Sequence, residues 1–176
     1  MNGFSVNRVA YAEESCLGLY RKLAAGVTVV TTCGPDGEPL GLTASAVTTL
    51  SLRPPMMLAC LSSTSATLAA IRTRRAFAIH LLRADQSALA GVFAGKAGPG
   101  KFAGVEFQWA LGIPVLADAL GWAACVLAEE RGYGDHSVVV GHVTSVRSGP
   151  GEPLIWHDQT FRGLSTRERQ DALVDH

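Results

Sequence analysis

The segment 132–143, GYGDHSVVVGHV, places an acid and a histidine directly before a run of valines. β-Branched valines predict a buried strand, so Asp135 and His136 lie at the mouth of the core, next to flexible glycines. A polar turn explains such a pair when it is considered alone. The alternative is a ligand-facing histidine whose orientation is set by the neighbouring carboxylate.

A cluster of hydroxyl side chains follows the apolar run MMLACLS and opens a helical segment. It comprises Ser62, Ser63, Thr64, Ser65 and Thr67. Hydroxyls and free backbone N–H groups at a helix start, where the dipole is positive, are well suited to bind a phosphate group. Simple N-capping of the helix is the alternative interpretation.

Small residues fill the segment 41–46, GLTASA, between two predicted strands. They would let a flat ring approach the backbone and hydrogen-bond to it. A tightly packed bulge is the alternative. The nearby Gly95–Lys101, GKAGPGK, matches most of a P-loop, but Phe102 stands where the loop needs Ser or Thr and Pro99 lacks a backbone N–H. We therefore interpret residues 94–104 as a loop.

Short strands dominate the elements that must position these residues. Strands are predicted at 26–33, 46–52, 56–62, 76–82, 122–130 and 137–146, with 153–158 and 160–164 completing the sheet. An amphipathic helix is predicted over 13–24, a second after the hydroxyl cluster, and a third capped by Asp85. This pattern indicates one mainly-β barrel or sandwich domain over 13–164, with an N-terminal extension (1–12) and a polar C-terminal tail (165–176).

Composition excludes several classes of protein. With 15 basic and 15 acidic residues the formal net charge is zero, and no basic stripe predicts nucleic-acid binding. The chain is 48% hydrophobic and only 17% charged, which favours a homodimer that hides part of the apolar surface. No apolar run is long enough for a signal peptide or a membrane span.

The cysteines and histidines predict a reduced protein without a metal site. The four cysteines are far apart and include no Cys-x-x-Cys pair, which is typical of a cytoplasmic protein without disulfides. The five histidines have no metal-ligand spacing. We therefore expect a cytoplasmic protein that binds neither metal, membrane nor nucleic acid.

Taken in order, six segments resemble the short-chain flavin reductases, the reductase partners of two-component flavin monooxygenases. They are KLAAGVTVVTT, GLTASAVTTLSLRPPMMLACL, SSTSATLAAI, FAIHLL, GDHSVVVGHV and PLIWHDQTFRGL, within residues 15–164. The resemblance implies a flavin-binding (FMN-binding) split barrel, a Greek-key β-barrel with two or three short flanking helices. It also implies a homodimer with flavin near the subunit interface.

The resemblance also implies roles for individual residues. The flavin ring is expected against Thr43, Ala44, Ser45 and Ala46, and the ribityl chain and phosphate against Cys60, Leu61, Ser62, Ser63, Ser65 and Thr67. Lys101 and Phe102 match a basic-aromatic pair that closes over the phosphate. His136 matches the histidine of a Gly-Asp-His motif near the nicotinamide, and Asp135 would orient it. These two are the expected catalytic residues.

Three positions depart from the family pattern. Arg53 stands where an acid is usual, His80 where asparagine is common, and Gly100-Lys101 replaces Asp-Arg. A lysine offers the phosphate a point charge instead of a bidentate fork.

The expected activity is an NAD(P)H:flavin oxidoreductase that passes a hydride from NADH or NADPH to FMN or FAD and supplies reduced flavin to a separate monooxygenase. Two alternatives remain open: a split-barrel enzyme that retains its flavin and reduces an organic substrate, and a non-catalytic flavin-binding module.

Overall fold

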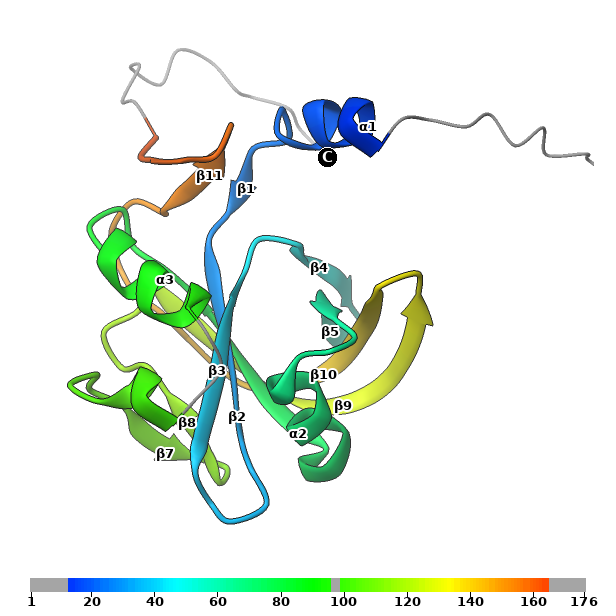
Figure 1. The fold of residues 1–176 in the computed structure, drawn as a ribbon. Coiled ribbons are helices and arrows are strands. Elements are labelled where there is room, and N and C mark those ends of the chain that lie inside the picture. The colour runs from blue at the N-terminus through cyan, green and yellow to red at the C-terminus, as the bar shows by residue number, and fades with distance from the viewer. Residues whose placement is uncertain (1–12, 96–98, 165–176) are drawn as a thin grey trace, which may run out of the picture.

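Antiparallel strands dominate the computed structural model, which describes residues 13–95 and 99–164 (Figure 1). The predicted N-terminal extension and C-terminal tail lie outside the described residues. The helices are α1 (Glu13–Tyr20), α2 (Ala66–Arg74), α3 (Ser87–Ala94) and the short 3-10 helix η1 (Pro99–Phe102). The strands are β1 (Ala25–Gly26), β2 (Thr28–Cys33), β3 (Pro39–Ala44), β4 (Val47–Leu52), β5 (Pro55–Ser62), β6 (Ala76–Leu81), β7 (Gln108–Ala110), β8 (Ile113–Val115), β9 (Gly121–Tyr133), β10 (His136–Ser148), β11 (Ile155–His157) and β12 (Thr160–Arg162).

Seven strands form the main sheet, in the order β3-β2-β6-β9-β10-β5-β4. Its two edge strands, β3 and β4, are consecutive in the chain and are joined only by Ser45 and Ala46. The edges must therefore come together, and the sheet curls into a barrel that is split between β3 and the β4–β5 hairpin. On one side of the split, the bond from Cys60 N to Ala46 O, at 2.8 Å, extends the pairing of β4 with β5 by one residue. The predicted mainly-β split barrel is confirmed.

The long β9–β10 hairpin forms one wall of the barrel, and its inner residues are buried. Val139 of β10 is fully buried with Phe77 of β6 and Leu61 of β5 in one apolar cluster. Gly141 lies at a register shift of the hairpin, where a Cβ would come within 2.6 Å of Phe77 Cζ. A glycine is needed there because β10 passes directly over the aromatic ring.

The C-terminal segments do not complete the main sheet as predicted. β11 and β12 instead form a separate three-stranded sheet with β1. Trp156 and Phe161 make a T-shaped contact, with ring centroids 4.9 Å apart, and pack against a second apolar cluster that contains Val27 and Phe93. The apolar alternation identified these strands, but their partner depends on contacts between distant parts of the chain.

Two helix predictions also need correction. Asp85 does not cap α3, because its carboxylate pairs with Arg83 Nε at 3.1 Å and Gln86 occupies the cap position, where its side chain makes no capping hydrogen bond to the helix. The first helix ends at Tyr20, four residues before its predicted end, and its apolar side chains Leu17 and Tyr20 are exposed. No helix within residues 13–95 and 99–164 is long and apolar enough to cross a membrane.

His80, which stands where the family commonly has asparagine, is fully buried in β6. Its Nδ1 bonds to Val29 O at 2.9 Å, and its Nε2 is the one buried side-chain polar atom without a partner in the described part of the chain. Burial disfavours the charged ring and lowers its pKa from 6.5 to about 4.

The neutral state of His80 predicts a loss of stability in acid. The unfolded chain takes up a proton at this ring near pH 6.5, whereas the folded protein does not do so until about pH 4. The contribution of the neutral His80 ring to stability is therefore fully present above pH 6.5, and the free energy of unfolding falls by up to about 3 kcal/mol between pH 6.5 and pH 4.

Replacing His80 with Asn should reduce this fall in the free energy of unfolding, which urea unfolding at pH 7 and pH 4 would measure. The exposed His142→Asn is the matched control, and an equal pH slope in His80→Asn and wild type would contradict this account.

Candidate functional site

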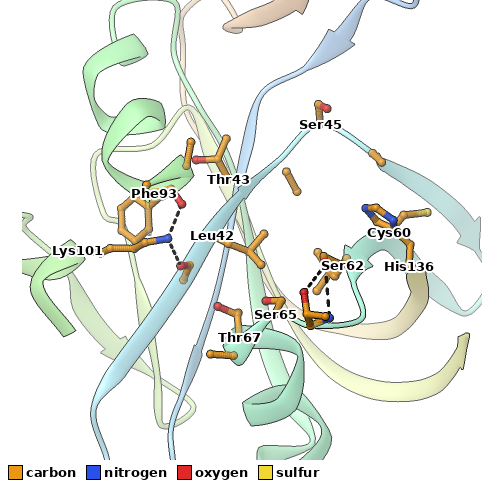
Figure 2. Close-up of a pocket in the computed structure, with 18 residues that line it drawn as sticks. Leu42, Thr43, Ser45, Cys60, Ser62, Ser65, Thr67, Phe93, Lys101 and His136 are labelled. Carbon is orange, nitrogen blue, oxygen red and sulfur yellow. Dashed lines mark hydrogen bonds between the residues drawn. The ribbon is translucent and has the colours of Figure 1, made fainter. Parts of the chain in front are cut away.

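A cavity of about 400 Å³ opens at the split of the barrel (Figure 2). It lies where β3, β5, β10, the start of α2 and the end of α3 converge. Eleven of the predicted site residues line it: Thr43, Ala44, Ser45, Ala46, Cys60, Leu61, Ser62, Ser65, Thr67, Lys101 and His136. Segments up to 95 residues apart in sequence are thus brought to one place (41 to 136).

The floor of the cavity is the end of β3 and the link to β4. The Thr43 hydroxyl donates to Ala90 O of α3 at 2.6 Å, and the Thr28 hydroxyl donates to Ala44 O at 2.6 Å. These bonds hold the backbone in place, while Ser45 and Ala46 are exposed. The result is a fixed surface with small side chains, which a planar ring can approach closely. The alternative of a tightly packed bulge describes this segment only in part. Gly41 packs closely against Phe93, but the pairing of β3 with β2 has no register shift.

The hydroxyl cluster both caps α2 and borders the cavity. Ser65 is the N-cap of α2 and accepts from Leu68 N at 3.3 Å, so the capping interpretation is correct. Ser62 Oγ lies 3.1 Å from Thr64 Oγ1, and both residues line the cavity. The first N–H groups of a helix have no backbone partner within it; Ser65 takes that of Leu68, and those of the residues before it can donate to a phosphate group.

Ser63 is placed differently from the rest of the cluster. It is exposed and outside the lining, and its amide donates to Asp135 O at 2.9 Å. That bond ties the end of β5 to the β9–β10 turn.

Lys101 carries a positive charge to the side of the cavity opposite His136 (Figure 2). Its ammonium donates to Phe93 O at 2.7 Å and to Gly41 O at 3.3 Å, and partial burial lowers its pKa. A cation at the C-terminal end of α3 is favourable because the helix dipole is negative there. The lysine is thereby held at the rim of the cavity, where it can attract an anionic ligand.

Phe102 does not line the cavity. It is buried behind Lys101 and makes T-shaped contacts with Phe93 and Phe107, at centroid distances of 5.0 and 5.1 Å. It supports Phe93, which does line the cavity and which the sequence interpretation missed. In the sequence, Phe93 is spaced with Leu89 and Val92 as on one face of a helix, which predicts a core residue. No local pattern predicts that it lies beside Lys101.

His136 begins β10 and faces the cavity from a two-residue hairpin turn. Gly134 occupies the first turn position with φ of +59°, a backbone conformation that favours glycine. His136 pairs in register with Ser62 of β5, and Figure 2 shows it beside Cys60. The polar-turn interpretation is therefore correct for Gly134 and Asp135, and the turn also places His136 in the wall of the cavity.

Asp135 lies outside the lining and holds the histidine ring. Its Oδ1 is 2.9 Å from His136 Nδ1, and this hydrogen bond holds the pKa of the Asp135 carboxyl below its usual range. The bond fixes the ring and leaves Nε2 for a ligand. The arrangement can position and polarise a bound group. Asp135 is itself exposed and outside the lining, so its contact with the cavity is made through His136.

Comparisons with known proteins identify several flavin reductases among the relatives of this chain. A family model described as "Flavin reductase like domain" matches residues 20–165. The reductase component of a 4-nitrophenol 4-monooxygenase/4-nitrocatechol 2-monooxygenase from Rhodococcus opacus is 41% identical over 78% of this chain and 74% of its own length. A flavin reductase (NADH) from Kitasatospora aureofaciens is 39% identical over 78% and 72%. The solved NADH:FAD oxidoreductase SgcE6 of Streptomyces globisporus, in complex with NAD and FAD fragments, is similar with a TM-score of 0.82 and 27% identity, over 88% of this chain and 94% of that one.

Proposed function

Since the chain belongs to the flavin reductase-like family, we propose that it is an NADH-dependent flavin reductase. It oxidises reduced nicotinamide, reduces FMN or FAD, and supplies reduced flavin to a separate flavin-dependent monooxygenase. This is supported by the names of its relatives, which include a flavin reductase (NADH) and the reductase component or subunit of monooxygenases. The observation that carries the proposal is the cavity at the split of the barrel, with the N-terminus of α2 along one side and His136 at another.

The residues around the cavity fit a flavin. The fixed, small-residue surface Thr43–Ala46 is suited to the ring, and the α2 N-terminus with Ser62, Ser65 and Thr67 is suited to the phosphate. When bound, the flavin supplies the acceptor for the hydride of the reduced nicotinamide.

The chain's own residues position the reactants. The bonds of Thr43 and Thr28 keep the ring surface in place, and Lys101 adds positive charge at the rim. His136, held by Asp135, orients the nicotinamide from the β10 side. Proximity of two bound rings accounts for most of the rate, so a strong nucleophile or base is not required.

The test is the loss of reduced-nicotinamide absorbance on mixing the protein with NADH, without flavin and with added FMN or FAD. We expect rapid oxidation that depends on added flavin. Oxidation that needs no added flavin and does not turn over free flavin would favour the enzyme that retains its flavin. Flavin binding without oxidation of NADH or NADPH would favour the non-catalytic module.

We also propose that a second copy of the chain covers the exposed apolar surface around α1. Leu17, Tyr20 and Leu23 are each more than half exposed, and they border a groove of about 360 Å³ that reaches Ser45 and Ala46 beside the cavity. So much apolar surface is unusual on a monomer. Sedimentation analysis should find a dimer, and Leu23→Glu should weaken it. A monomer at all concentrations would contradict the proposal.

A cytoplasmic location remains part of the proposal. The four cysteines, all described, are free thiols, as in proteins of a reducing compartment. Recovery of the protein from another cell fraction would contradict it.

A further inference from the structure

At the tip of the β9–β10 hairpin, β9 lies next to β10, which itself borders the cavity beside β5. Tyr133 of β9 pairs in register with His136 of β10, and His136 pairs with Ser62 of β5. Side chains that are directly opposite in antiparallel strands project from the same face of a sheet. Tyr133 therefore stands beside His136 on the face that borders the cavity, and it is 56% exposed.

The next row of the same face carries a cation. Arg131 is in register with Val138, and Val138 with Cys60, which lines the cavity. The Arg131 Cζ lies 5.6 Å from the centre of the Tyr133 ring, a cation–π distance. A planar guanidinium and an aromatic ring thus lie together at the edge of the site.

Packing of the fold does not explain this pair. Both side chains are exposed at a hairpin tip, and neither belongs to an apolar cluster of the described residues. The neighbouring acid Glu130 points to the opposite face of β9 from Arg131, because adjacent residues of a strand alternate. There it is bound by Arg72, with Arg72 Nη2 at 2.7 Å from Glu130 Oε1. Glu129 lies on the same face as Arg131, but within the described residues no ion pair joins the two. The Arg131 guanidinium can therefore interact with a ligand at the cavity end of the hairpin.

Stacked aromatic and guanidinium groups are typical surfaces for a nucleic-acid base. Both NADH and FAD have an adenosine half that lies away from the reacting ring and is joined to it through a pyrophosphate. We propose that Arg131 and Tyr133 bind this adenosine half of a dinucleotide cofactor, with the adenine stacked on the pair. The inference rests on the proposed reductase function.

The test compares cofactors that have the adenosine half with cofactors that lack it. Steady-state rates are measured for wild type, Tyr133→Ala, Tyr133→Phe and Arg131→Lys, with NADH or reduced nicotinamide mononucleotide and with FMN or FAD. If the pair holds the adenosine of NADH, Tyr133→Ala should raise the KM for NADH roughly tenfold while kcat and the KM for the mononucleotide stay unchanged. Tyr133→Phe keeps the ring and should behave as wild type, whereas Arg131→Lys keeps the charge but loses the plane and should resemble Tyr133→Ala.

The flavin comparison separates the two sources of adenosine. A rise in the KM for FAD but not for FMN, with either nicotinamide, would assign the pair to FAD. The inference would be overturned if Tyr133→Ala changed the KM for NADH and for its mononucleotide equally and the KM for FMN and FAD equally. It would also be overturned if none of these KM values changed.

A direct binding measurement keeps the inference distinct from the reductase proposal. ADP-ribose, which contains the adenosine half without nicotinamide, is titrated into wild type and Tyr133→Ala by calorimetry. If ADP-ribose binds to wild type and binds more weakly to Tyr133→Ala, the proposed adenosine site is supported even if no NADH is oxidised. If ADP-ribose binds equally to both proteins, or does not bind to wild type, the proposed adenosine site is wrong, whether or not the protein is a reductase.

Discussion

Replacing His136 with alanine is expected to lower kcat/KM for NADH by about 10- to 100-fold, since small errors in the placement of reacting groups cost rates of that order. The ring is fixed by Asp135, at 2.9 Å, and faces the cavity from β10. The phosphate side of the cavity lies on α2 and is untouched by this change. Flavin affinity, measured by quenching of flavin fluorescence, should therefore remain close to that of wild type.

The matched control is His142→Ala, which removes an exposed histidine of the same strand that lies outside the cavity. It should leave kcat/KM unchanged. Asp135→Asn should have a smaller effect than His136→Ala, because Asp135 acts only through the ring. If His136→Ala weakened flavin binding and left the KM for NADH and kcat at saturating flavin unchanged, the assigned role of His136 would be wrong.

Replacing Ser65 with aspartate is expected to weaken FMN binding roughly 10- to 100-fold, because it sets a negative charge against the phosphate. Aspartate is as good an N-cap as serine, so α2 itself should keep its stability. Ser65 lies in the cavity lining and begins the helix whose free N–H groups are expected to hold the phosphate. Fluorescence titration with FMN measures the loss.

Riboflavin, which lacks the phosphate, provides the internal control for this variant. Its affinity should be nearly the same for wild type and Ser65→Asp, and the neutral cap Ser65→Asn should retain most of the FMN affinity. Equal losses for FMN and riboflavin would mean that the change distorts the cavity. Unchanged FMN affinity would place the phosphate elsewhere.

Local patterns in the sequence were sufficient to predict the elements on which the site is built. Apolar runs predicted β9 and β10, the Gly-Asp pair predicted the turn before His136, and the hydroxyl cluster predicted the start of α2. These features depend on neighbouring residues: side-chain periodicity, positive φ at glycine, and hydroxyls that bond to the next turn.

The sequence alone therefore predicted a mainly-β chain, most of its strands and the turn before His136, but not the short hairpin of β7 and β8. Its resemblance to a family named candidate residues for a ring, a phosphate and a nicotinamide. Only the tertiary structure decided that β3 and β4 form opposite edges of one sheet, that β11 and β12 join β1, and that Phe102 lies in the core. It also placed Tyr133 beside His136 and Phe93 beside Lys101. The physical reason is that strand pairing and core packing are contacts between distant segments, and local propensity carries no information about which distant segment a strand will meet.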